Sequence, residues 1–160
     1  MHTALLVLAL AVAPQVHIAE MSDLPIVTMA PYDVTANADK TVDSAFARAK
    51  AHHKRVLIDL GGNWCTDCVV FANIMALPEV KRFVDAHYEV AVVNVGRFNT
   101  NLQIPARFGI TTRLEGVPAV LIADPQTGRL IDQGHIAALA DARHMTPQGI
   151  ADWLAKWADD

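Results

Sequence analysis

Two cysteines stand three residues apart in the chain, at Cys65 and Cys68, and the sequence of 160 residues contains no others. Thiols at this spacing can close a small disulfide ring and open it again. The residues before them, 56–60, form an apolar run typical of a buried strand, and the residues after them are typical of a helix. Because the amino end of a helix stabilises negative charge, it would favour a thiolate there. The pattern indicates disulfide exchange rather than a structural bridge.

Two other uses of the cysteines stay open. A zinc site needs about four ligands, and the suggestive histidines are His52 and His53, adjacent residues at the end of a predicted helix. Cys65 could instead be a buried structural cysteine. Trp64 and Gly62 place it in a turn rather than in a packed helix, which favours the reactive role. We expect no metal at this site.

Asp59 interrupts the apolar run shortly before the cysteines. A charge in a buried strand is costly unless it is paired or has a use. Burial would raise the pKa of this carboxyl group, which could then accept a proton as Cys68 becomes a thiolate. The alternative is that Asp59 lies at an exposed end of the strand.

Hydrophobic periodicity and turn residues predict the elements around these side chains. The predicted helices cover residues 41–54, 65–76, 78 onward, 104–108 and 147 onward. The predicted strands cover residues 24–29, 56–60, 88–95, 119–123 and 129–133. The last two strands would form a hairpin, and residues 111–115 an exposed excursion. This order predicts an α/β fold with a mixed central sheet of four to five strands and helices on both faces.

Three separated features of the sequence resemble the thioredoxin superfamily. The first is Trp64-Cys65-Thr66-Asp67-Cys68 after a strand, which is the redox motif of that family. The second is Asp59, at a position where thioredoxins carry a buried acid. The third is Gly116-Val117-Pro118, which leads into the strand predicted over 119–123. The resemblance covers roughly residues 41–157 and implies a thioredoxin-like fold.

The resemblance also implies roles for individual residues. Cys65 would attack a disulfide in a partner protein, and Cys68 would resolve the mixed disulfide. Pro118 would be cis and would present the backbone of Val117 to an extended peptide, whereas an ordinary trans proline before a strand is the alternative. Trp64 would shield the disulfide and contact substrate, or would simply pack.

The residues between the cysteines bear on the direction of electron flow. Thioredoxin has glycine and proline there, and this chain has Thr66 and Asp67. A carboxylate beside Cys65 opposes formation of its thiolate. We therefore expect a thiol:disulfide oxidoreductase that reduces disulfides in partner proteins. A disulfide oxidase or isomerase for exported proteins and a non-catalytic binding module are the alternatives.

The composition of the chain limits the classes of partner and cofactor that we expect. The net charge is -4 and no basic run occurs, which argues against nucleic acid. The sequence has no glycine motif for nucleotides and no other cofactor signature, so we expect no cofactor and a separate reductase as electron donor.

The amino-terminal residues bear on the compartment. The apolar run 4–13 ends at Pro14, is too short to span a bilayer, and suits the core of a signal peptide. An ordinary apolar helix or strand is the alternative. We expect a signal peptide over 1–19, a linker over 20–40 and a thioredoxin-like domain over 41–160. The mature protein would have no stable membrane span and would be periplasmic or otherwise exported, with a cytoplasmic location as the alternative.

Overall fold

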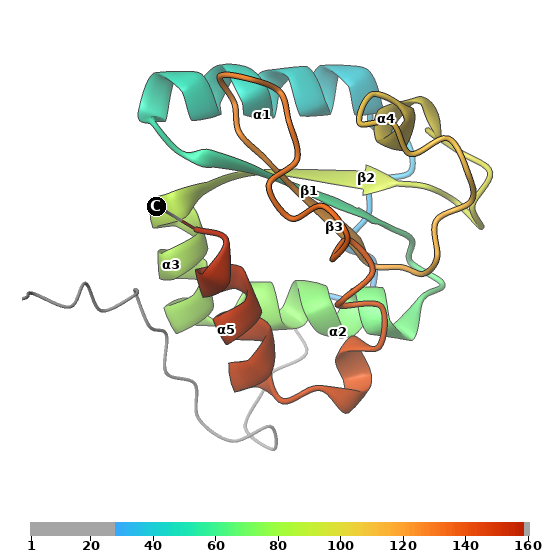
Figure 1. Cartoon of the computed structure of the whole chain (residues 1–160). Helices are drawn as coiled ribbons and strands as arrows, with labels where there is room; N and C mark the ends of the chain where they lie inside the picture. Colours follow the sequence, from blue (N-terminus) through green and yellow to red (C-terminus); the bar gives the residue numbers. More distant parts are fainter. Residues whose placement is uncertain (1–27, 159–160) are drawn as a thin grey trace, which may run out of the picture.

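The computed structural model describes residues 28–158. The signal peptide predicted over 1–19 lies outside this range, as does most of the strand predicted over 24–29. A three-stranded sheet lies between two layers of helices (Figure 1). The elements are, in chain order, α1 (Ala38–His52), β1 (Arg55–Gly61), α2 (Thr66–Met75), α3 (Pro78–His87), β2 (Tyr88–Asn94), α4 (Gln103–Ala106), β3 (Ala119–Ala123), η2 (Ala142–His144) and α5 (Pro147–Lys156).

The central strand of the sheet is β1, and the strand order is β2–β1–β3. β2 runs parallel to β1, and β3 runs antiparallel to it. Every residue of β1 after Arg55 is buried, which explains the apolar run in the sequence. The parallel pair needs a crossover connection, and α2 and α3 provide it. The predicted α/β fold with a mixed central sheet is confirmed.

The predicted number of strands, four to five, is wrong for the part of the chain that the structure describes, which has three. The returning strand expected over 129–133 makes only one isolated bridge, between Leu130 and Ala123. Beyond this bridge, the backbone N–H of Ile122 donates to the side-chain Oδ1 of Asp132 at 3.0 Å. A carboxyl oxygen thus takes the place of a backbone carbonyl at the edge of β3, and the ladder does not continue.

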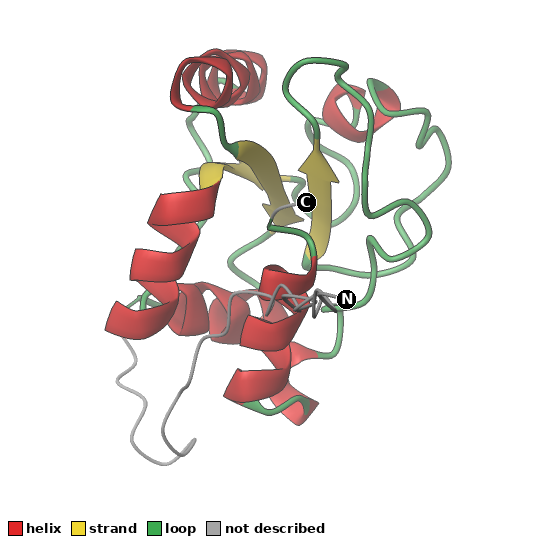
Figure 2. Cartoon of the chain, turned by 60° about the vertical axis from the view of Figure 1, so that its left-hand side comes forward, coloured by secondary structure: helices red, strands yellow, loops and turns green. Residues whose placement is uncertain are grey.

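Helices cover both faces of the sheet (Figures 1 and 2). α1 and α4 lie on one face, and α2, α3 and α5 lie on the other. Successive side chains of β1 alternate between the faces, so that Ile58 and Leu60 join the core beneath α1 while Leu57 joins the core beside α3 and α5. A polar side chain on β1 is therefore enclosed on all sides. None of the helices within residues 28–158 is long and apolar enough to cross a membrane.

The ends of two helices show how local sequence sets them. α1 begins at Ala38, earlier than the predicted start at residue 41, because the side chain of Asn37 caps it by accepting the N–H of Lys40 at 2.9 Å. Asparagine is among the residues preferred at this capping position. α5 begins as predicted, with Thr146 accepting the N–H of Gly149.

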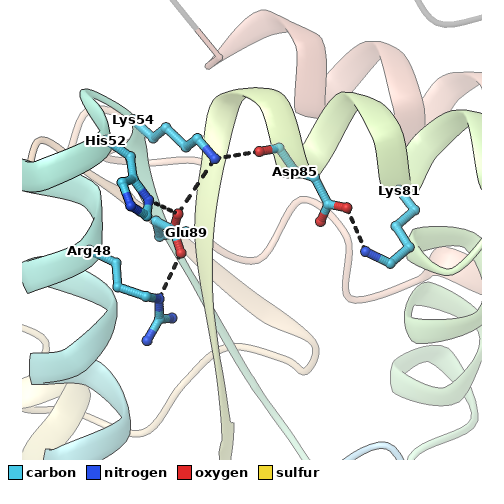
Figure 3. Close-up of polar contacts among 6 residues, drawn as sticks. All are labelled: Arg48, His52, Lys54, Lys81, Asp85 and Glu89. Atoms are coloured by element: carbon cyan, nitrogen blue, oxygen red, sulfur yellow. Dashed lines mark hydrogen bonds and ion pairs between the residues drawn. The ribbon is translucent and has the colours of Figure 1, made fainter.

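A cluster of charged side chains ties α1 to β2 at the end of the sheet away from the cysteines (Figure 3). Glu89 accepts a hydrogen bond from Arg48 at 2.8 Å and lies 2.8 Å from Nδ1 of His52 and 3.5 Å from Nζ of Lys54. Burial alone would raise the pKa of Glu89, but these hydrogen bonds and positive charges lower it to about 2. Lys54 also donates to the backbone carbonyl of Asp85. Glu89 therefore stays ionised and holds the two elements together.

The loop before β3 is less exposed than expected. Residues 111–115, predicted as an exposed excursion, are exposed except for Leu114, which is 5% exposed. Leu114 belongs to the same core cluster as Ile104 of α4 and Val117. It anchors the loop beside the cysteines.

Candidate active site

The two cysteines form a disulfide at the start of α2. Cys65 is the N-cap of this helix, and its Sγ accepts the backbone N–H of Cys68 at 3.1 Å. A negative charge on Cys65 would be stabilised there by the N–H groups and by the helix dipole. Cys65 is 6% exposed, whereas Cys68 is fully buried. Of the two sulfurs, Cys65 is therefore the one that a partner reaches first.

The peptide bond between Val117 and Pro118 is cis, as predicted. The carbonyl oxygen of Val117 lies 3.3 Å from Sγ of Cys65, although the two residues are 52 positions apart. The fold thus brings the Val117–Pro118 segment to the wall opposite the disulfide. Both residues are buried in the absence of a partner.

Trp64 and its neighbours form an exposed rim beside the disulfide. Trp64 is 42% exposed, and its Nε1 donates to the carbonyl of Gly96 at 2.7 Å. Its ring lies 6.0 Å from that of Phe98 and has the guanidinium of Arg97 stacked over it at 4.8 Å. Arg113 stacks over Phe98 at 4.2 Å. The exposure of Trp64 favours a contact surface over plain packing. Arg97, Phe98 and Arg113 lie in loops, so no hydrophobic periodicity in the sequence pointed to them.

A hollow of about 330 Å³ adjoins this rim. Phe98, Leu102, Ile110 and Arg113 are among the residues that line it. Leu102 is 44% exposed, which adds an apolar side chain to the surface near Trp64.

Asp59 lies on β1 behind the disulfide and is 3% exposed. It is therefore buried, and the alternative of an exposed strand end is excluded. Its partners across the sheet are Val92 and Val120. Burial raises the pKa of Asp59 to about 7, and a hydrogen bond from the hydroxyl of Tyr32, at 2.9 Å, acts in the opposite direction. A carboxyl group with this pKa can accept or return a proton at neutral pH.

Tyr32 is a site residue that the sequence did not predict. It comes from the segment predicted as a linker, yet it is 1% exposed. The side chain of Asn63 brackets its backbone, accepting the N–H and donating to the carbonyl of Tyr32, each at 2.9 Å. An aromatic residue between Pro31 and Asp33 belongs to no periodic pattern, so only its size hinted at burial.

Gly61 makes room for Tyr32 next to the inner cysteine. A Cβ atom added at Gly61 would lie 2.9 Å from Sγ of Cys68 and closer still to the Tyr32 hydroxyl oxygen. The hydroxyl oxygen and this sulfur are therefore less than twice that distance apart. Asp59, Tyr32 and Cys68 form a contiguous buried group behind the disulfide.

Asp67, expected beside Cys65, is 8% exposed and faces η2. It accepts the backbone N–H of Arg143 at 3.0 Å, and Nε of the same arginine lies 3.7 Å away. This ion pair offsets part of the negative charge that was expected to act on Cys65. It also fixes the start of α2 against η2.

The described residues contain no set of side chains that would form the alternative metal site. Within 28–158, no group of three or more histidine, cysteine, aspartate or glutamate side chains could hold a metal ion. His52 is engaged with Glu89 at the end of α1.

Comparison with known proteins agrees with this geometry. A family model described as thioredoxin-like matches residues 36–125. The crystal structure of a disulphide isomerase from Xylella fastidiosa Temecula1 is 34% identical with a TM-score of 0.74, and the match covers 81% of this chain and 97% of that chain. A protein of unknown function from Pseudomonas aeruginosa is 16% identical with a TM-score of 0.41, covering 87% and 96%.

No curated protein matches the sequence. The family match spans more than half of the chain, and the relative from Xylella is matched over almost its whole length. The chain therefore belongs to the thioredoxin-like family.

Proposed function

We propose that this thiol:disulfide oxidoreductase works from its reduced, dithiol form and reduces disulfides in partner proteins. The observation that carries the proposal is the placement of Cys65. Its sulfur caps α2, faces the carbonyl of Val117, and forms the more accessible end of a disulfide whose other sulfur is buried. One thiol is thus placed to attack a partner, and the other to act within the protein.

The reaction has two steps. The thiolate of Cys65 attacks one sulfur of a partner disulfide, which forms a mixed disulfide and releases the other partner sulfur as a thiolate. Cys68 then attacks Sγ of Cys65, closing the disulfide and releasing the partner in its reduced form. Two electrons pass from the protein to the partner.

The second step requires Cys68 to lose its proton inside the protein. Cys68 is fully buried, so bulk water is a poor acceptor for that proton. The carboxyl group of Asp59, whose pKa burial raises to about 7, is a base of suitable strength nearby. We assign Asp59 this role.

The partner would bind along Trp64, Val117 and Pro118. An extended peptide can pair with the backbone of such a segment by β-strand addition, and the aromatic ring of Trp64 offers apolar contact area. The hollow lined by Phe98 and Leu102 continues the same surface.

The direction of electron flow rests on Asp67. Asp67 lies in the first turn of α2, two residues after Cys65, and its negative charge opposes the thiolate that a strong oxidant needs. The ion pair with Arg143 weakens this effect without removing it, because the side chain of Arg143 is half exposed. Measurement of the thiolate fraction of Cys65 checks this inference, and a thiolate that persists far below neutral pH would contradict it.

Disulfide isomerisation is the second candidate. It is favoured by the relative from Xylella fastidiosa, which is described as a disulphide isomerase. An isomerase shares the first step, and the partner's own thiol then resolves the mixed disulfide. The redox potential separates reductase, isomerase and oxidase, since about 30 mV changes the equilibrium tenfold.

We further propose that the protein is exported, to the periplasm or beyond, and receives its electrons from a separate reductase. The apolar run 4–13 supports export. The absence of a cofactor signature in the sequence supports an external electron donor.

Reduction of insulin by the protein in the presence of a dithiol tests the proposed function. We expect turnover by the wild type and none by Cys65→Ser, because that variant lacks the nucleophile. Catalysis that is equal in the two proteins would overturn the assignment. Absence of turnover in both would favour a thioredoxin-fold binding module.

Trapping identifies the partner. Cys68→Ser cannot resolve, so we expect the mixed disulfide at Cys65 to accumulate, and mass spectrometry would name the protein attached. The double variant with Cys65→Ser is the matched control and should capture nothing.

A further inference from the structure

A buried tyrosine completes the polar group behind the disulfide. The hydroxyl of Tyr32 donates to Oδ1 of Asp59 at 2.9 Å and occupies the space over Gly61, next to Sγ of Cys68. Tyr32, Asp59 and Cys68 are 1%, 3% and 0% exposed. A hydroxyl is costly to bury unless it is hydrogen-bonded. Here its bond is made to the acid that the reaction needs.

We propose that Tyr32 is a positioning residue that holds the Asp59 carboxyl group for proton exchange with Cys68 when the mixed disulfide is resolved. This inference rests on the proposed function. In the step concerned, Cys68 gives its thiol proton to Asp59 and its sulfur bonds to Sγ of Cys65. The bond between Cys65 and the partner sulfur breaks, and the partner leaves with the electron pair as a thiolate.

The surroundings of Asp59 make the tyrosine its main polar contact. Across the sheet, Asp59 faces Val92 of β2 and Val120 of β3, which carry no charge. The segment before α1 contributes Tyr32, and α2 contributes Cys68, whose Sγ lies next to the Tyr32 hydroxyl. No charged side chain within residues 28–158 forms an ion pair with Asp59. The state of the acid therefore depends on burial and on one hydroxyl.

These two influences have opposite signs. Burial raises the pKa of Asp59 to about 7, and the hydrogen bond from Tyr32 lowers it by stabilising the carboxylate. Loss of the hydroxyl would raise the pKa further and leave Asp59 protonated at neutral pH. A protonated Asp59 cannot accept the proton of Cys68, so resolution would slow and would need a higher pH.

The position of Tyr32 is set by the motif itself. Asn63 lies two residues before Cys65, and its side chain holds both backbone groups of Tyr32. Gly61 provides the space that the hydroxyl fills, since any side chain there would collide with it. The residues that lead into the disulfide thus also place the tyrosine.

Tyr32→Phe removes the hydroxyl and keeps the ring. When the reduced protein reacts with one equivalent of dithiobis(nitrobenzoate), the attack of Cys65 releases one coloured thiol and resolution by Cys68 releases a second. We expect the second release to become about tenfold slower at neutral pH, with its pH midpoint about one unit higher. The rate of the first release should change by less than about twofold, because the attack of Cys65 on the reagent involves no proton transfer to Asp59.

The other tyrosine of the chain provides a matched control. The chain has two tyrosines, and the hydroxyl of Tyr88 is also buried, donating to the carbonyl of Leu154 at 2.6 Å. Tyr88→Phe should leave both releases and the pH midpoint unchanged. Asn63→Ala keeps the Tyr32 hydroxyl but frees its backbone, and we expect a smaller shift of the midpoint in the same direction as in Tyr32→Phe.

A double variant shows whether Tyr32 acts through Asp59. If it does, Tyr32→Phe slows resolution no further once Asp59→Asn is present. An unchanged pH midpoint in Tyr32→Phe, equal slowing of both releases, or additive effects in the double variant would each overturn the proposal. A wild type that never releases the second thiol would instead contradict the proposed function.

Discussion

Two buried aspartates, Asp59 and Asp132, show how similar side chains take different parts in one molecule. They are 3% and 0% exposed, and burial raises the pKa of Asp59 to about 7 and that of Asp132 to about 6. Asp59 lies on the central strand and accepts a hydroxyl that adjoins the disulfide. Asp132 lies beyond the edge strand β3 and accepts the backbone N–H of Ile122. Burial and proton affinity alone do not distinguish them.

Their neighbours do distinguish them. Asp132 completes the hydrogen bonding of a sheet edge, and its Oδ2 has no hydrogen-bond partner among residues 28–158. Asp59 has a reacting sulfur within reach of its hydrogen-bond partner. A raised pKa therefore marks a functional acid only where a group that must gain or lose a proton lies beside it.

The largest expected effect separates the two acids by activity. Asp59→Asn removes the proposed base, and we expect insulin reduction at neutral pH to slow by about 100-fold. Asp132→Asn keeps an oxygen for Ile122 and lies outside the site, so its rate should stay within about twofold of the wild type. Initial rates measured side by side check this. Equal slowing in both variants would remove the distinction.

In measurements of stability, Asp132 rather than Asp59 should show the distinguishing effect. Asp132→Ala leaves the buried N–H of Ile122 without its acceptor, and we expect the free energy of unfolding to fall by about 1–3 kcal/mol. Urea unfolding measures this loss, provided that the dependence of the free energy on urea concentration is the same in both proteins. Asp132→Asn is the control, because its amide oxygen can still accept. If the alanine and asparagine variants unfold together, the contact with Ile122 contributes nothing.

The pH dependence of stability should show both acids. Each binds its proton more tightly in the folded protein than in the unfolded one, where the pKa is near 3.8. The stability from this preference is complete below about pH 4 and is lost as the pH rises through about 6 for Asp132 and about 7 for Asp59. We expect unfolding to become easier over that range, by at most about 1.4 kcal/mol per pH unit for each acid.

Asparagine variants assign this slope. Asp59→Asn should reduce the slope from about pH 4 to about pH 7, whereas Asp132→Asn should reduce it only from about pH 4 to about pH 6. Urea unfolding of the oxidised protein at a series of pH values measures both. A slope that survives in the double variant would have to come from other groups.

The smallest expected effect concerns Glu89, an acid whose side chain is 14% exposed and whose pKa is lowered rather than raised. Its partners Arg48 and His52 have side chains about half exposed to water. We expect Glu89→Gln to lower the free energy of unfolding by less than about 1 kcal/mol, and less still in high salt. The effect should vanish as the pH falls from 4.5 through about 2, opposite in sign to that of the two buried aspartates.

The exposed pair of Asp85 and Lys81, at (i, i+4) on α3, provides the comparison for that small effect (Figure 3). Asp85→Asn removes an ion pair whose two side chains are more than half exposed. It should cost less than Glu89→Gln in the same urea experiment. A larger loss for Asp85→Asn would mean that burial of Glu89 brings no advantage.

The sequence predicted those site residues whose position depends on local pattern. Cys65 and Cys68 follow an apolar strand and open a helix, and Asp59 interrupts that strand, so periodicity and burial placed all three. The cis bond before Pro118 was predicted from the family resemblance, since the residue alone does not determine it. These predictions cover the disulfide at the start of α2 and the Val117–Pro118 segment that faces it.

Residues that are positioned by long-range contacts could not be predicted from the sequence. Tyr32 is 27 positions from Asp59, and Arg143 is 76 positions from Asp67. Neither belongs to a periodic element, so their partners follow only from the folded chain. The predicted strand over 129–133 has suitable composition but was interrupted because the Asp132 side chain, rather than its backbone, bonds to β3.

Because Gly61 has no side chain, a residue from outside the segment 59–68 can pack against the disulfide. Tyr32 fills the space over Gly61, and it lies four positions before residue 36, where the match to the family begins. Transfer of residues 59–68 alone into another thioredoxin-like protein would carry the thiols and the acid but not the hydroxyl between them. A hybrid protein that is meant to keep the chemistry must exchange the segment around Tyr32 together with the motif.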